Sequence, residues 1–100
     1  MGLTYAIDEL YLTGWSTLES TGCECAPDGR LYPGLARIER EFRDAGFCLS
    51  LQQIELFDCC RAEWRSVDGT AAGGVVGASQ PEAAVYALAQ LRRSAMASSR

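Results

Sequence analysis

The sequence predicts an α+β fold, a two-layer sandwich in which an antiparallel sheet of three to five strands packs one face against two helices. Two amphipathic segments, residues 33–46 and 79–93, have the apolar spacing of helices, and the stretch 47–77 between them alternates apolar and polar residues as strands do. The 100 residues, 48% of them hydrophobic, suffice for one core. We therefore expect a single domain over residues 1–95 and a disordered tail at 96–100, where small residues form no apolar stripe.

The N-terminal segment, residues 1–32, is the least regular part of the chain. Between residues 3 and 18 the apolar positions nearly match a helical stripe, but the same stretch is rich in the aromatic and β-branched residues that are typical of strands. Of the two alternatives we favour a strand that ends at Gly14. The following residues, 19–31, are rich in turn formers and predict a loop or a short hairpin.

Residues 33–46 predict the first helix. Its apolar face contains Leu35, Ile38 and Phe42, which are spaced by whole turns. The opposite face pairs arginines with acidic residues four positions apart, so we expect it to be solvated rather than to bind phosphate. Gly46 suits the left-handed conformation that commonly ends a helix.

A hairpin and a third strand are expected to follow this helix. Residues 47–51 and 61–67 alternate apolar and polar side chains, as half-buried strands do, and the turn between them falls within residues 56–60. Asp68 begins an Asp-Gly turn signal, and the third strand then runs through residues 73–77.

The last helix has the best-defined start. Ser79 and Glu82 match a capping box, in which each side chain bonds the other residue's backbone amide, and Pro81 suits the first turn. The amides of an uncapped helix start attract phosphate. Here Glu82 brings its own carboxylate to that end, and no glycine-rich phosphate-binding loop precedes it. We therefore expect neither a nucleotide nor another cofactor.

Residues 33–93 thus follow the order helix, hairpin, third strand, helix. This order resembles the double-stranded RNA-binding domain, an αβββα unit with both helices on one face of its sheet. The resemblance implies the fold of that family, whose members hold RNA through lysines at the start of the last helix. The matching positions of this chain are Gln80, Pro81 and Glu82, none of which is basic. The resemblance therefore does not extend to the residues that bind RNA.

The charge of the chain also argues against a nucleic-acid surface. All nine basic residues are Arg, there is no Lys or His, and the net charge is −4, whereas binding to a phosphate backbone depends on clustered positive charge. The arginine bias is typical of a GC-rich genome, and we expect a bacterial protein. No apolar run approaches the ~20 residues of a membrane span. The N-terminus lacks the positive charge of an export signal, so we expect a cytoplasmic protein that does not bind membranes.

Catalytic and metal-binding residues are scarce. Without His, neither a Ser–His–Asp nor a Cys–His arrangement can form, and we expect no enzyme activity. The weak candidates for a zinc site are Cys23, Cys25, Cys59 and Cys60. Their C-x-C and adjacent-pair spacings fit structural zinc sites poorly, so we predict no metal. We expect Cys48 and one of the adjacent pair in the core, and Cys23 and Cys25 on the surface.

The leading functional hypothesis is a protein-interaction module. Two helices cover one face of the sheet, so the other face must meet the N-terminal segment, a second copy of the chain or water. Trp15 and Trp64 either pack into the core or stand on this open face as anchors for a partner. Arg61 and Arg65 are further candidates for partner binding. We expect the partner to be another protein or a second copy, which forms a homodimer.

Two alternatives to this hypothesis remain. In the first, the chain is a nucleic-acid-associated protein that contacts phosphates through Arg61, Arg65, Arg92 and Arg93. In the second, its cysteines make it a metal-binding or redox protein.

Overall fold

A computed structural model of the chain describes residues 2–15 and 22–98. These residues contain three α-helices, a two-stranded sheet and a three-stranded sheet, both antiparallel, which confirms the predicted α+β class. In chain order the elements are α1 (Leu3–Leu12), β1 (Cys23–Cys25), β2 (Leu31–Pro33), α2 (Leu35–Asp44), β3 (Phe47–Ile54), a 3₁₀ turn (Glu55–Phe57), β4 (Cys59–Ser66), β5 (Ala72–Gly77) and α3 (Gln80–Ser98). The predicted order of helix, three-stranded sheet and helix is found from α2 to α3.

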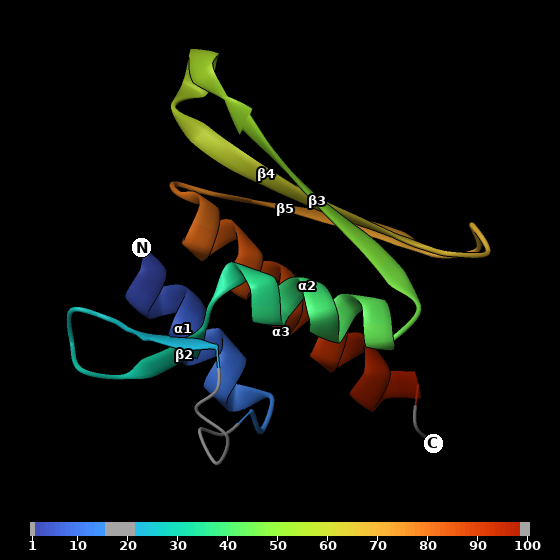
Figure 1. The fold of residues 1–100 in the computed structure, drawn as a ribbon, viewed down its shortest axis with the longest axis horizontal. Coiled ribbons are helices and arrows are strands. Elements are labelled where there is room, and N and C mark those ends of the chain that lie inside the picture. The colour runs from blue at the N-terminus through green and yellow to red at the C-terminus, as the bar shows by residue number, and fades with distance from the viewer. Residues whose placement is uncertain (1, 16–21, 99–100) are drawn as a thin grey trace.

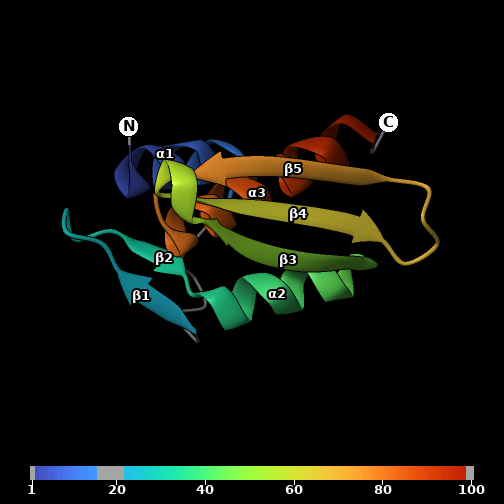
Figure 2. The ribbon, with the colours of Figure 1, turned by 90° about the horizontal axis from the view of Figure 1, so that it is seen from above.

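The three helices lie on one side of the three-stranded sheet (Figure 1). Helix α2 packs against β3, α3 packs against β4 and β5, and α1 packs against α3. Figure 2 shows the sheet from its other side, where no helix covers the strands. Strand β4 is central, and β3 and β5 form the two edges. The arrangement is therefore a layer of helices on one face of a sheet whose second face is open.

The antiparallel register assigns alternate residues of each strand to the two faces of the sheet. The rows that face the helices are Leu49–Trp64–Gly73, Leu51–Ala62–Val75 and Cys60–Gly77. Each of these residues is buried or half-buried, whereas their neighbours along the strands are mostly exposed. The alternation predicted for the strands is confirmed.

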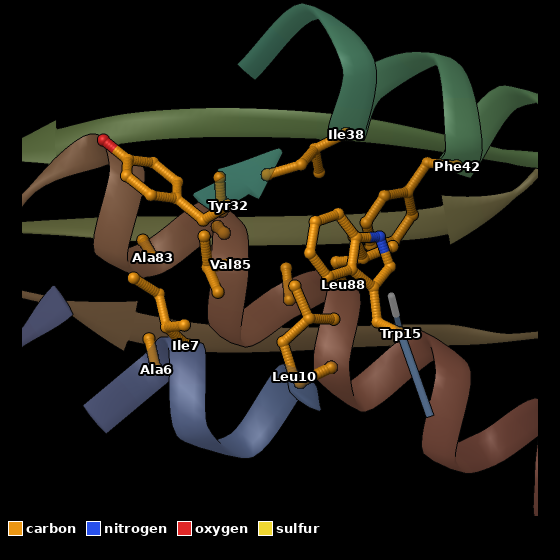
Figure 3. Packing of buried hydrophobic residues seen from close by; sticks show 14 of the residues in the cluster. Ala6, Ile7, Leu10, Trp15, Tyr32, Ile38, Phe42, Ala83, Val85 and Leu88 are labelled. Atoms are coloured by element: carbon orange, nitrogen blue, oxygen red, sulfur yellow. The ribbon is translucent and has the colours of Figure 1, made fainter. Parts of the chain in front are cut away.

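The core lies between the helices and the sheet (Figure 3). Helix α1 contributes Ile7 and Leu10, α2 contributes Ile38 and Phe42, and α3 contributes Leu88, each at most 1% exposed. Complete burial of such a side chain stabilises the fold by about 1.5–3 kcal/mol. The apolar face predicted for α2 is thus the face that packs into the core.

The N-terminal strand that we expected to end at Gly14 is wrong, because the chain forms helix α1 there. Ala6, Ile7 and Leu10 are fully buried, and their spacing places all three on one face of the helix, which packs against α3. In a strand, Ile7 would point away from the other two. The sequence pattern alone was ambiguous, and the contact with α3 selected the helix.

In two other segments the structure decides between the predicted alternatives or extends a predicted element. Part of the turn-rich stretch 19–31 forms a short hairpin, in which β1 pairs with β2 as a sheet separate from the main one, while residues 16–21 lie outside the described part of the chain. Helix α3 continues through Ser98 into the region expected to be a tail, where alanines favour a helix, and residues 99–100 are not described. No described helix is both long and apolar enough to cross a membrane.

The end of β5 approaches the start of α3 too closely for a side chain. A Cβ atom at Gly77 would lie 2.6 Å from the backbone nitrogen of Ala83 and 3.0 Å from its Cα. Such distances require backbone to move, because no flexible side chain is there to yield. Gly77 therefore determines how closely α3 packs against the sheet.

We predict that Gly77→Ala lowers the free energy of unfolding by about 1–3 kcal/mol, because the added methyl group pushes α3 away from β5. Urea unfolding followed by circular dichroism measures this loss. The matched control is Gly74→Ala, where the nearest atom lies at 3.5 Å, an ordinary contact. We expect this control to change stability by less than about 0.5 kcal/mol. Equal losses in the two variants would contradict the steric explanation.

The β4–β5 turn is held by the carboxylate of Asp68. Its Oδ1 atom accepts hydrogen bonds from Ser66 Oγ (2.8 Å), from the Thr70 amide (3.0 Å) and from Thr70 Oγ1 (2.7 Å). These donors stabilise the ionised form and lower the pKa of Asp68 to about 2.

We predict that NMR titration of the Asp68 carboxyl carbon gives a midpoint near pH 2. Because the folded pKa is below the unfolded value of about 3.9, the stabilisation by Asp68 is complete above that value and is lost as the pH falls through the folded pKa. Thr70→Ala removes one of the three donors and should raise the midpoint. A wild-type midpoint near the unfolded value would contradict the hydrogen-bond geometry.

Candidate functional site

The open face of the three-stranded sheet is polar. Along β4, Arg61, Glu63 and Arg65 are exposed on this face, and the first two form an ion pair at 3.2 Å. Strand β3 adds the exposed residues Cys48 and Ser50. Glu63 and Arg65 line a shallow depression of about 370 Å³ together with Cys48 and Ser50. On β3 and β4 this face therefore carries charged and polar groups, whereas on β5 the register places the exposed Val76 on it, opposite Arg61.

Neither tryptophan stands on this open face. Trp15 is 6% exposed; its ring lies 5.6 Å from that of Tyr11, and the Arg37 guanidinium lies 5.5 Å from the centre of the indole. Trp64 points toward the helices, where its ring lies 5.6 Å from that of Phe42. The structure therefore favours the other alternative that we considered, since Trp15 lies in the core and Trp64 is half-buried against it.

The four arginines considered for phosphate binding do not form one surface. Arg92 Nε donates a hydrogen bond of 2.8 Å to Thr13 Oγ1, and an Arg93 guanidinium nitrogen lies 2.6 Å from a carboxylate oxygen of Glu9. These contacts join α3 to α1 and its C-terminal turn. The other two arginines are on the opposite side of the sheet, on the open face of β4. The arrangement offers no continuous cationic track.

The start of α3 is capped within the chain. Ser79 Oγ accepts a hydrogen bond of 3.3 Å from the Glu82 amide, and the Ser79 carbonyl accepts one of 3.0 Å from the Ala83 amide. The reciprocal bond of a capping box, from the Ser79 amide to the Glu82 carboxylate, is not formed in the described structure. Glu82 as a whole residue is nevertheless only 6% exposed. Among the described residues no buried side-chain oxygen lacks a hydrogen-bond partner, so the Glu82 carboxylate reaches solvent instead of the Ser79 amide.

The cysteines do not assemble a metal site among the described residues, where no group of three or more potential ligands occurs. Cys25 and Cys48 are exposed, Cys23 and Cys59 are half-buried, and Cys60 is buried, which raises the pKa of its thiol. The placement of Cys48 in the core was wrong, because the strand register turns it to the open face. Cys23 Sγ accepts a hydrogen bond of 3.1 Å from Arg37.

An apolar surface that the sequence analysis missed lies at one end of the sheet. Leu56 and Phe57, in the turn between β3 and β4, are 86% and 73% exposed, and Val76 on β5 is 55% exposed. The signal was a Leu-Phe pair within the predicted turn at residues 56–60, where polar residues are usual. Exposed apolar side chains that gather in one place are typical of binding surfaces.

An open depression of about 630 Å³ lies beside this apolar surface. Its wall includes Phe57 from the turn, Val76 from β5 and Tyr86 from α3. Two acidic residues, Asp58 and Glu82, also line it. Burial raises the pKa of Tyr86, and the negative charge of Glu82 adds to the shift. The depression thus combines aromatic and aliphatic side chains with carboxylates.

The edge formed by β5 is the second feature of this region. Strand β5 pairs with β4 on one side only, and its sequence AGGVVG contains no charged residue and no proline. Most natural edge strands carry charges or prolines that prevent pairing with another chain. The free backbone groups of β5 are therefore able to accept a further strand.

Comparison of the chain with protein-family models, with curated proteins and with solved structures found no match. Inference about function therefore depends on the surfaces described above. Of these, the open sheet face is polar, and the edge of β5 with its neighbouring apolar end has the character of a binding surface.

Proposed function

We propose that the protein is a small, non-enzymatic protein-interaction module that forms a homodimer through the β5 edges of two copies. The observation that carries this proposal is the unprotected edge, with its free backbone donors and acceptors. An added strand satisfies these groups by the same hydrogen bonds that join β4 to β5.

The composition of β5 favours a second copy as the added strand. Its six residues, Ala72–Gly77, are uncharged, so two copies meet without repulsion between like charges. Gly73 and Gly74 leave the middle of the strand free of side chains. Two antiparallel edges are related by a twofold axis, so each copy contributes the same surface and the assembly closes as a dimer.

The exposed apolar residues next to the edge add to the driving force. Val76 is 55% exposed in the single chain and lies on the strand that pairs. Burial of apolar surface is favourable by roughly 25 cal/mol per Å². The polar row on β4 remains solvated in such a dimer, because it lies on the open face rather than at the edge.

The cytoplasm is the compartment that we propose for this dimer. All five cysteines are free thiols, and free thiols persist in a reducing compartment.

The nucleic-acid alternative has less support. The αβββα order of elements favours it, but fold alone does not determine function. Arg92 and Arg93 are bonded to Thr13 and Glu9, so using them for phosphate requires breaking the contacts between α3 and α1. The net charge of −4 adds general repulsion from a polyanion.

We predict that the purified chain has twice its monomer mass in light scattering at micromolar concentration. Val76→Lys places a charge on the pairing edge and should weaken the dimer at least tenfold, or about 1.4 kcal/mol. The matched control is Val67→Lys, at another exposed valine in the β4–β5 turn, which should leave the dimer intact. A monomeric wild type at about 100 μM, or equal effects of the two substitutions, would overturn the proposed dimer.

We also predict that the chain causes no mobility shift of duplex RNA, even at low salt where phosphate contacts are strongest. A shift that weakens steeply with added salt would favour the nucleic-acid alternative. In that case the variants Arg61→Gln and Arg92→Gln would identify which side of the sheet holds the RNA.

A further inference from the structure

A groove between the C-terminal ends of α2 and α3 is lined mainly by apolar side chains. They are Ala45 at the end of α2, Phe47 at the start of β3, Ala71 before β5, and Leu88 and Leu91 on α3. The groove lies on the helix side of the sheet, near the β4–β5 turn (Figure 1). Its volume of about 470 Å³ is within the range of ligand sites, about 300–1,000 Å³.

Arg92 lines the same groove and differs from the other half-buried arginines. Among the described residues, the half-buried arginines are Arg30, Arg37 and Arg92. Arg30 Nε lies 2.8 Å from a carboxylate oxygen of Asp28, and Arg37 Nε lies 3.3 Å from one of Glu41. Arg92 forms no ion pair with any described residue, and its hydrogen bond is to a neutral hydroxyl. Because a partly buried charge is stabilised by an opposite charge, Arg92 favours an anion beside it.

The hydroxyl of Thr13 orients the Arg92 guanidinium. Arg92 Nε donates to Thr13 Oγ1 at 2.8 Å, and this buried hydroxyl donates in turn to the Leu10 carbonyl at 2.6 Å. Because Nε is engaged, the two terminal nitrogens are the donors left for a ligand, and a carboxylate accepts two parallel bonds from such a pair. Glu41 also lines the groove, but Arg37 compensates its charge.

We propose that this groove binds a small amphipathic carboxylate, a hydrocarbon body that ends in one carboxylate. The carboxylate pairs with Arg92, and the body lies against Phe47, Leu88 and Leu91. A neutral apolar molecule leaves the Arg92 charge unpaired, and an ammonium compound is repelled by it. The site does not depend on the proposed dimer, because none of the β5 residues, Ala72–Gly77, lines the groove.

The first test is calorimetric titration of the unmodified chain with octanoate at neutral pH. We expect one octanoate per chain, and at least tenfold weaker binding of octylammonium and of 1-octanol, which have the same body without the negative charge. Butanoate should also bind at least tenfold more weakly, because each buried methylene contributes about a fourfold gain in affinity. No binding of octanoate at millimolar concentration, or an equal affinity for any of the three control compounds, would overturn the proposal.

The second test identifies the counter-ion. Arg92→Gln should weaken octanoate binding at least tenfold. The matched control is Arg93→Gln, at the next residue of α3, which pairs with Glu9 and does not line the groove, so it should leave binding unchanged. Equal effects of the two substitutions would contradict the assignment of Arg92.

A third variant separates loss of the charge from loss of the contact between α3 and the end of α1. Thr13→Val removes the hydrogen bond to Arg92 but keeps the charge, so it should lower thermal stability and retain the preference for octanoate over octylammonium. If Thr13→Val loses binding as completely as Arg92→Gln, the effect is one of folding and the proposed counter-ion is wrong.

A short peptide tests the other source of a carboxylate on an apolar body, which is the C-terminus of a protein. Titration with acetyl-leucyl-leucine should show weaker binding than octanoate. Tighter binding of the peptide would indicate that the groove recognises a protein C-terminus, and the proposed ligand class would be wrong.

Discussion

The close packing of α3 against the sheet determines how the other elements are arranged. Small residues make it possible: Ala83, Ala84 and Ala87 are fully buried on the helix, and Gly77 approaches it from β5. Because these residues have little or no side chain, the helix comes close enough for dispersion contacts along its length. Helix α3 in turn packs against α1 and α2, so its position sets where both are placed.

This constraint also determines which surfaces are left for binding. With all helices on one side, the sheet has a solvated face with the Arg61–Glu63 pair and an uncovered edge at β5. The packing of α3 against the sheet places Glu82 beside the last residues of β5 and the turn that follows β3. Exposed apolar residues, the free edge and Glu82 are therefore found in one region, because one helix start and one strand end meet there.

Much of the fold was predictable because local patterns agreed with tertiary burial. The spacing of Ile38 and Phe42 predicted the buried face of α2, and the alternation through β3 and β4 matched the register of the sheet. The site was less predictable. Trp64 was ambiguous because an aromatic residue in a half-buried strand suits either face, and Leu56 and Phe57 were missed because a short apolar pair in a turn has no period from which to infer exposure.

Local patterns were sufficient to predict α2, the three strands of the main sheet and the start of α3 at Ser79, because each of these patterns fits one kind of element. The remaining features depend on contacts between residues far apart in the sequence. The pattern of residues 3–12 is compatible with both a strand and a helix. The helix forms because α3 provides an apolar surface for Ile7 and Leu10. The buried environment of Glu82 likewise arises only when β5 and the β3–β4 turn come together around it. A local pattern indicates which side of a helix or strand is apolar. Which other element packs against that side depends on contacts between residues far apart in the chain.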